Sequence, residues 1–258
     1  MGRLDAVGLA VISGPAFFGR GGWRRLTVTA IAILFSAAGE SQAQITTVPT
    51  GLSPSDPYRL AFVTTTARDG TSPNIGVYNA FVSAAANSAP DLAALGTTWS
   101  AIASTLTVDA RDNTGTNPDS SNGVPIYLLN DTLLVNDNAD LWDSSIAVNF
   151  DVDENGGSVN SQVWTGTNQF GLSGGVSLSL GANESLIAFH IVGRTTFSTG
   201  DWVGNPASVR NSAVELPLYA VSDVLTVPAT IPALGPLGLL VLVCGVVAIG
   251  RALAKRTG

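Results

Sequence analysis

The sequence predicts an α+β domain that is rich in short antiparallel strands and has one early amphipathic helix. Three observations predict it: an alternating run, then a run at helical spacing, then several short alternating runs separated by turn-forming residues. No repeat of fixed period accompanies them. We expect this domain over residues 58–224, after a leader (1–43) and a linker (44–57) and before a C-terminal segment (225–258).

The first two elements have strong local signals. The run "YRLAFVTTT", which starts at Tyr58, alternates and is rich in β-branched residues, so it predicts a strand. In "SPNIGVYNAFVSAAANSAP" we expect a helix with Ser72 as its N-cap, Pro73 at the first helical position and Pro90 as its stop. The helical spacing gives one apolar stripe: Ile75, Tyr78, Phe81, Val82 and Ala85.

The remaining elements are short. "TTWSAIAS" predicts a strand after a helical turn, and "SLIAFHIVGR" and "LPLYAVSDVLTV" predict later strands. Asn130-Asp131 is expected to form a tight turn between "VPIYLL" and "TLLV". The stretch 155–157, Asn-Gly-Gly, predicts a second hairpin turn between two alternating runs.

Charge is distributed unevenly along the chain. From Gln44 to Thr230 there are seventeen acidic residues, five arginines and no lysine. Such a body repels phosphate backbones, so we expect no nucleic-acid partner. The single cysteine, Cys244, lies outside this stretch, so the body has neither a disulfide bond nor a thiolate metal site.

The N-terminal stretch "GWRRLTVTAIAILFSAAGESQAQ" has the order of a secretory signal peptide. Two arginines precede an uncharged, largely apolar run, which is expected to form the signal helix. Small residues at positions 41 and 43 predict cleavage between Ala43 and Gln44. We therefore expect export machinery and signal peptidase as transient partners.

The C-terminal stretch is uncharged from Val224 to Gly250, which is long enough for a transmembrane helix. A basic end follows, made of Arg251, Lys255 and Arg256. These features, together with the motif Ile231-Pro232-x-Leu234, resemble the IPTL-CTERM sorting signal, a relative of the PEP-CTERM tails of Gram-negative bacteria.

The IPTL-CTERM resemblance implies passage through the inner membrane, removal of the tail by a sorting protease, and delivery to the cell surface or extracellular matrix. The usual Ser-x-Trp-Gly portion is replaced here by Gly-Pro-Leu-Gly at 235–238. The alternative is a plain transmembrane anchor that leaves the domain in the periplasm.

The central region carries a second resemblance. The stretches "RLAFVTTT", "YNAFVSAAA", "TTWSAIAS", "GVPIYLLNDTLLVNDNADLWD" and "VWTGT" are similar to secreted bacterial domains with a C-type-lectin-like, endostatin-like fold. The resemblance implies that architecture for the α+β domain. The Glu-Pro-Asn or Gln-Pro-Asp and Trp-Asn-Asp motifs of sugar-binding lectins are absent, so no sugar-binding residue is carried over.

One metal site is a candidate. In "DVDENGGSVNSQ", Asp151, Asp153, Asn155 and Gly156 match positions 1, 3, 5 and 6 of an EF-hand-like calcium loop. Position 12 is Gln162 instead of glutamate, and the flanks are expected to be strands. A solvated acidic hairpin turn explains the same residues, so both interpretations stay open; calcium is the one cofactor considered.

Two weaker patterns remain. The acids of "NDNADLWD", at Asp137, Asp140 and Asp143, predict either a solvated loop or a divalent-cation site. "GLSGG" has the spelling of a nucleophile elbow around Ser173, but a triad also needs a base, and His190 is the sole histidine. We predict a structural role for both residues and no catalytic group.

These features together predict an exported protein of the cell surface or matrix with a non-enzymatic binding or structural role. Exopolysaccharide or another matrix component is its expected partner. An extracellular hydrolase that uses a pair of carboxylates is the alternative, because many acids are present.

Overall fold

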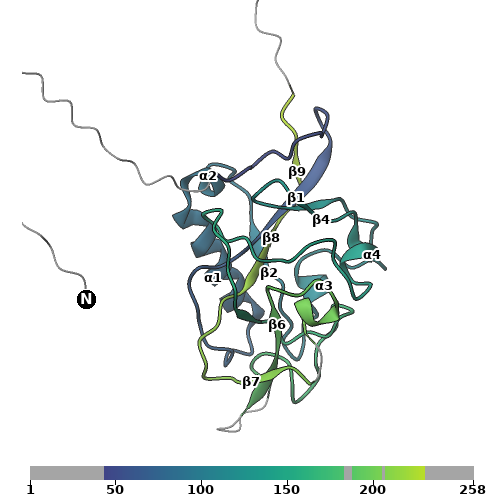
Figure 1. Ribbon diagram of the computed structural model, residues 1–258. Coiled ribbons are helices and arrows are strands. Elements are labelled where there is room, and N and C mark those ends of the chain that lie inside the picture. Colours follow the sequence, from purple (N-terminus) through teal and green to yellow (C-terminus); the bar gives the residue numbers. More distant parts are fainter. Residues whose placement is uncertain (1–43, 183–187, 205–206, 230–258) are drawn as a thin grey trace, which may run out of the picture. The chain divides into compact units, whose positions relative to one another are not determined.

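The computed structural model describes residues 44–182, 188–204 and 207–229, and these form a mixed α+β domain (Figure 1). Gln44 is described, whereas Ala43 lies outside the described residues. Two further predictions also lie outside the described residues: the sorting motif (Ile231, Pro232 and Leu234) and the basic end (Arg251, Lys255 and Arg256). Among the described residues, no helix has the length and hydropathy to cross a membrane.

The strands form two sheets. The larger sheet has the order β2-β8-β1-β3-β4, with β9 also pairing with β1. Its strands are β1 (Pro57–Val63), β2 (Trp99–Ala101), β3 (Ile126–Leu128), β4 (Leu133–Val135), β8 (Tyr219–Ser222) and β9 (Leu225–Thr226). The smaller sheet, of order β5-β6-β7, consists of β5 (Gln162–Trp164), β6 (Phe189–Arg194) and β7 (Val209–Asn211).

Strand pairing is antiparallel, as predicted, at every pair of named strands except one. β1 and β3 run parallel, with Arg59 opposite Ile126. Between these strands the chain crosses through helices and β2, so it re-enters beside β1 in the same direction. The domain is thus rich in antiparallel strands, as predicted, but the pair at the centre of the larger sheet is parallel.

Short helices and one longer helix accompany the sheets. They are α1 (Ile75–Ser88), α2 (Pro90–Ala93), α3 (Ala110–Asn113), α4 (Asn138–Leu141) and the 3₁₀ helix η1 (Gly200–Trp202). The expected N-cap of α1 is wrong: Asn74 caps it, because its side chain accepts a hydrogen bond from the Gly76 N–H at 2.9 Å. Ser72 instead accepts a hydrogen bond from the Asn74 N–H. Pro90 begins α2, as a stop for α1 requires.

Helix α1 covers the open edge of the larger sheet. β2 is the edge strand, and the Ala101 N–H donates to Asn79 Oδ1 at 2.9 Å while the Ala101 carbonyl accepts from Asn113 Nδ2 at 2.7 Å. Asn79 and Asn113 also bond to each other. These amides satisfy backbone groups that an unpaired edge would expose.

Aromatic rings fill the space between the sheets and the loops. Phe150 stacks on Tyr219 with ring centroids 4.2 Å apart, and Trp202 lies 6.0 Å from Phe150. All three side chains are fully buried. The Tyr219 hydroxyl donates to the Trp202 carbonyl at 3.0 Å, so the buried polar tip is satisfied.

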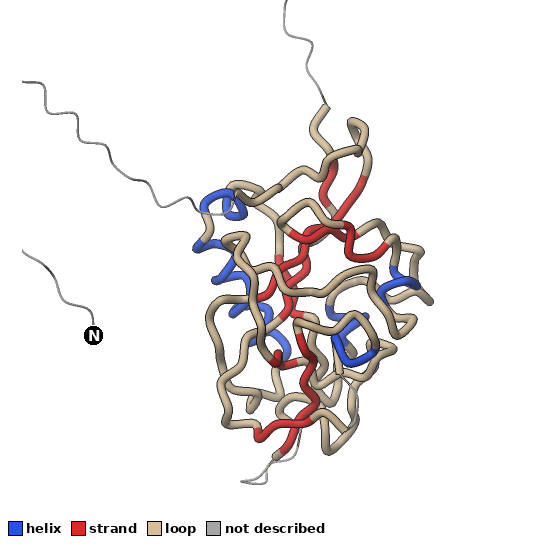
Figure 2. The backbone as a smooth tube through the Cα atoms, in the orientation of Figure 1, coloured by secondary structure: helices blue, strands red, loops and turns tan. Residues whose placement is uncertain are grey.

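Both predicted turns are present, and Figure 2 shows how much of the domain is loop. The chain reverses at Asn130-Asp131 between β3 and β4, with Asp131 at φ 69°. Val152 pairs with Ser158 across the second turn, where Gly156 has φ 81°. A positive φ favours glycine, which explains its place in this turn.

The expected linker 44–57 is held against the domain. The Thr46 N–H donates to the Leu129 carbonyl at 2.6 Å, and the Tyr58 hydroxyl donates to the Thr47 carbonyl at 2.8 Å. Near the end of the linker, the Asp56 carbonyl accepts a hydrogen bond at 3.0 Å from the N–H of Val227, which follows β9. Backbone bonds therefore tie the chain to the domain at Thr46, before β1, and at Val227, after β9.

Candidate binding groove beside Glu154

Two adjoining hollows, of about 240 Å³ and 230 Å³, form the groove that we call the Glu154 groove. They share Glu154 and Asn155, and so belong to one surface feature. The first is also lined by Gln44, Ile45, Ala89, Pro90 and Asp91. The second is also lined by Thr65, Thr66, Phe81, Ala84, Ala85 and Ser88. Hydroxyl, amide and carboxylate groups thus face apolar side chains from α1 and the N-terminal segment.

Glu154 is the least exposed acid described, with 2% of its surface accessible. Its carboxylate accepts hydrogen bonds from the Thr65 N–H, at 2.9 Å, and from the Thr65 hydroxyl. Within the described residues, the ion pairs are Arg68–Asp69 and Arg111–Asp119, so no cation neutralises Glu154 there. Hydrogen bonds alone hold this buried acid.

The pairing of two distant segments explains how Glu154 reaches Thr65. The end of β1 pairs in parallel with the segment at Asp153, and the Val63 N–H donates to the Val152 carbonyl at 2.8 Å. This pairing sets the next residues of each segment side by side, which brings Glu154 against Thr65. The tight turn that follows keeps Asn155 at the groove.

Asp153 stabilises that turn. Its Oδ1 accepts hydrogen bonds from the N–H groups of Asn155 and Gly157, both at 2.8 Å. Asp151 lies apart from these bonds, and its Oδ2 accepts from the Ser158 hydroxyl at 3.3 Å. Asp153 therefore acts as a local acceptor for the turn, as free Asp side chains often do in Asx turns.

The calcium interpretation stays a prediction at Asp151, Asp153 and Asn155. Among the described residues, no group of three or more His, Cys, Asp or Glu side chains is arranged to hold a metal ion. A calcium ion at this turn would need backbone carbonyls, amide oxygens or water to complete its oxygen ligands.

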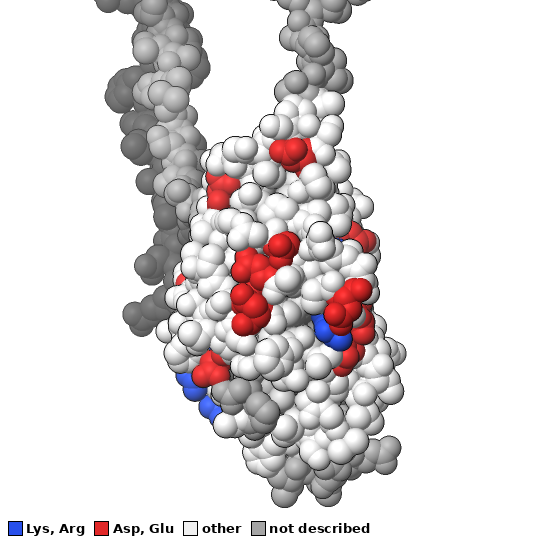
Figure 3. Space-filling view, turned by 90° about the vertical axis from the view of Figure 1, so that its right-hand side faces the viewer, with Lys and Arg blue, Asp and Glu red and all other residues white. Residues whose placement is uncertain are grey.

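The second acidic group is tied into local structure around α4. Asp137 Oδ1 accepts from the Asp140 N–H at 2.9 Å, which caps the helix, and Asp140 Oδ2 accepts from Asn136. Asp143 accepts from Ser145. Figure 3 views the domain from the side of Figure 1 where α4 lies, and it shows acidic side chains gathered in groups. This face has the negative charge that the composition predicted.

Ser173 and His190 are not joined by any hydrogen bond. The Ser173 hydroxyl lies 2.5 Å from that of Ser179 and accepts from the Gly175 N–H. His190 is buried in β6, and neither ring nitrogen has a hydrogen-bond partner among the described residues. Desolvation by burial lowers the pKa of His190. The nucleophile–base hydrogen bond of a triad is therefore missing.

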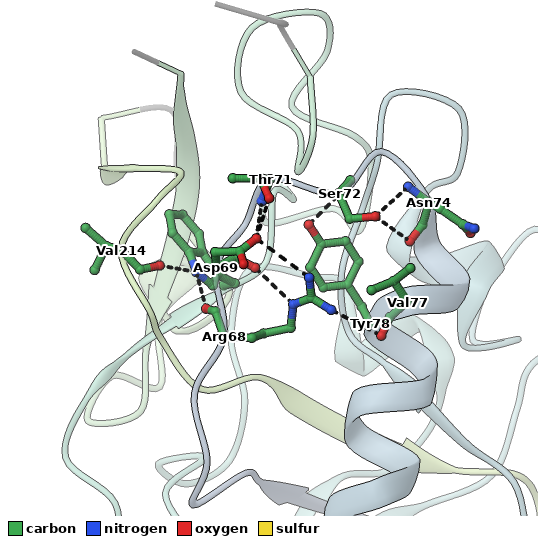
Figure 4. Close-up of polar contacts among 9 residues, drawn as sticks. Arg68, Asp69, Thr71, Ser72, Asn74, Val77, Tyr78 and Val214 are labelled. Carbon is green, nitrogen blue, oxygen red and sulfur yellow. Dashed lines mark hydrogen bonds and ion pairs between the residues drawn. The ribbon is translucent and has the colours of Figure 1, made fainter. Parts of the chain in front are cut away.

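A cluster of polar and aromatic side chains adjoins the groove at the start of α1 (Figure 4). The Arg68 guanidinium lies 4.6 Å from the centre of the Tyr78 ring and 3.6 Å from Asp69, and it also approaches Phe81. The Tyr78 hydroxyl donates to the Ser72 carbonyl at 2.9 Å. Burial raises the pKa of Tyr78. These contacts fix the helix face that carries Phe81 into the groove.

Comparison with protein-family models gives no match, and neither does comparison with curated proteins. The Glu154 groove is therefore a candidate binding site on the basis of its geometry alone. Its central residue, Glu154, was not singled out from the sequence, although it lies within the predicted hairpin turn. The one available signal was an acid at the turn next to an alternating run.

Proposed function

We propose that this chain is an exported protein of the cell surface or extracellular matrix, with a binding or structural role, delivered by a C-terminal sorting signal. A signal peptidase would release the N-terminal segment at Ala43–Gln44. A sorting protease would then remove the tail that begins near Ile231, after the inner membrane has held it transiently.

One observation carries the proposal: the chain just inside each expected processing site is bonded to the domain. The Thr46 N–H donates to the Leu129 carbonyl, and the Val227 N–H donates to the Asp56 carbonyl. Cleavage after Ala43 and loss of the tail from Ile231 would leave both of these bonds in place. The working protein would then be the acidic domain, which is lysine-free from Gln44 to Thr230.

The Glu154 groove is our proposed contact surface for a hydroxyl-rich polymer such as exopolysaccharide. Its carboxylates accept hydrogen bonds, its amides both accept and donate them, and the half-buried Phe81 offers an apolar surface beside them. The excess of acids disfavours anionic polymers, since like charges repel. Neutral or cationic polysaccharides fit this surface better.

A C-type-lectin-like, endostatin-like arrangement is the architecture that we propose for the domain. Support comes from the sequence stretches that resemble such domains and from the early strand, the single long helix and the short later strands that follow them. Architecture of this kind hosts many roles, so it does not assign the ligand.

The experiment is intact mass spectrometry and cell fractionation of the protein from its native host. We expect a chain that begins at Gln44 and ends near Ile231, outside the inner membrane. An uncut chain in the cytoplasm would overturn the proposal. A chain that keeps Arg251 and Lys255 in the inner membrane would favour the alternative of an anchored periplasmic domain.

A carboxylate-pair hydrolase is the second candidate, since Asp91 and Glu154 line the same hollow. Its test is release of reducing ends from the host's exopolysaccharide by the purified protein. The hydrolase predicts that Asp91→Asn abolishes this release. A binding module predicts sedimentation with the polymer, without release, and weaker sedimentation after Phe81→Ala.

A further inference from the structure

The first hollow of the Glu154 groove contains negative charge without a cation. Asp91 and Glu154 are its two acids, and no lysine, arginine or histidine lines it. Glu154 is almost fully buried, and its carboxylate is bonded to the Thr65 N–H and hydroxyl with no counter-charge beside it. A small cation placed in this hollow would stabilise the domain.

The chain itself carries one residue into this hollow from the expected processing site. Gln44 lines it, and the residues that follow are fixed: Ile45 packs against the core and the Thr46 N–H donates to the Leu129 carbonyl. Consecutive Cα atoms lie about 3.8 Å apart, so the backbone nitrogen of Gln44 stays close to the hollow.

Cleavage after Ala43 would create a cation on that nitrogen. Hydrolysis of the Ala43–Gln44 peptide bond consumes one water molecule, leaves a carboxylate on Ala43 and frees an amine on Gln44. A free α-amine has a pKa of about 7.7–8.0, so it takes up a proton at neutral pH. The new ammonium group would then lie beside Asp91 and Glu154.

We propose that removal of the leader completes the first hollow of the Glu154 groove: the α-ammonium group of Gln44 pairs with the carboxylates of Asp91 and Glu154 and fastens the N-terminal segment. This inference rests on the proposed export and cleavage. It adds that processing changes the folded domain itself, because the uncut chain has a neutral peptide group at this position. It also gives a positively charged partner to Glu154, whose carboxylate is bonded to the uncharged Thr65 among the described residues.

The sequence supplies a clean chemical test. Lys255 is the single lysine of the chain, so the Gln44 α-amine is the one primary amine in a processed body. The protein is purified from its native host, and its intact mass fixes both ends. It is then acetylated with an amine-reactive ester at neutral pH, and the melting temperature Tm is measured before and after.

We expect the folded protein to acetylate roughly tenfold more slowly than a peptide of sequence Gln-Ile-Thr-Thr, because an ion pair that raises the amine pKa by about one unit lowers the unprotonated fraction tenfold. Forced acetylation should lower Tm by about 2 °C. This loss should vanish above about pH 10, because the unmodified amine has then lost its proton and carries no charge for acetylation to remove.

Asp91→Asn is the matched variant, because Asp91 is exposed and the change keeps its shape. It should restore rapid acetylation and reduce the Tm loss. A chain that begins at Gln44 but acetylates at the peptide's rate would contradict the proposed ion pair, without affecting the proposal that the protein is exported and cleaved. Loss of ammonia from Gln44, by attack of the amine on its side-chain amide, would do the same. An uncut leader would overturn both proposals.

Discussion

Glu154 accepts hydrogen bonds from both the backbone N–H and the hydroxyl group of Thr65, a residue 89 positions earlier in the chain. The contact joins the segment after β1 to the hairpin turn of Asp153, and both residues line the second hollow of the groove. It therefore ties the stability of the domain to the shape of its candidate binding surface.

Glu154→Ala should lower the free energy of unfolding by about 1–3 kcal/mol, because the Thr65 N–H loses its acceptor inside the domain. Denaturant unfolding, with the midpoint and slope fitted together, measures this loss. Glu154→Gln keeps an acceptor without the charge and should cost less. If both variants match the parent protein, the two hydrogen bonds contribute nothing to stability.

Asp153→Ala should destabilise the turn by about 1–3 kcal/mol, because two N–H groups lose their acceptor. We expect the same loss in excess chelator and in millimolar Ca²⁺, since the turn is held by its own bonds. Asp151→Ala, which removes one weak contact, is the matched control.

Calorimetric titration of the domain with Ca²⁺ decides between the two interpretations of this turn. Heat of binding that disappears in the Asp151→Ala variant, together with a Tm that rises with Ca²⁺, would establish the calcium site at Asp151, Asp153 and Asn155. Silence at millimolar concentration would reject it.

The elements with local signals were predictable from the sequence. The run that forms β1 was recognisable as a strand, although its residues from Tyr58 to Val63 are all buried instead of alternating. α1 has an apolar stripe of which Tyr78, Val82 and Ala85 are buried, and Asn155-Gly156 is a strong turn pair. The N-cap of α1 was harder, because Ser72 and Asn74 are both good caps and lie two residues apart.

The groove was not predictable in the same way. Thr65 and Glu154 meet only because β1 pairs in parallel with the segment at Asp153, and neither run contains a signal for its partner. The parallel pairing of β1 with β3 has the same origin. Contacts between distant segments depend on the path of the whole chain, which periodicity does not encode.

His190 should make the domain less stable in mild acid. Its pKa is lowered in the folded state by burial, so the unfolded chain binds protons more readily. Stability is then full above about pH 6.5 and declines as the pH falls below that value. Arg210, an exposed residue, lies opposite His190 on β7.

His190→Phe is the control for this decline, because the ring has similar shape and does not titrate. Thermal unfolding between pH 5 and 8 should show a smaller loss of Tm in the variant than in the parent. The variant should be as stable as the parent at pH 8, since two unpartnered ring nitrogens are removed. Equal pH profiles would exclude His190 as the cause.

Three tyrosines should resist ionisation until the domain unfolds. Burial raises the pKa values of Tyr58, Tyr78 and Tyr219 above the ordinary value near 10. The folded state therefore keeps their protons longer than the unfolded chain does, so stability is full below about pH 10 and is lost as the pH rises further. Tyrosinate absorbance and far-ultraviolet circular dichroism should consequently change together.

The Tyr78→Phe variant removes the hydroxyl group that ionises but keeps the aromatic ring that packs in the domain. The variant loses the hydrogen bond to the Ser72 carbonyl, which should cost about 1 kcal/mol at neutral pH, but it also loses one group that opposes folding in alkali. The difference in stability between parent and variant should therefore shrink as the pH rises past 10. Because Arg68 stacks on this ring in either case, the cation–π contact is retained and does not enter the comparison. A constant difference across that range would show that Tyr78 ionises as freely in the folded domain as in the unfolded chain.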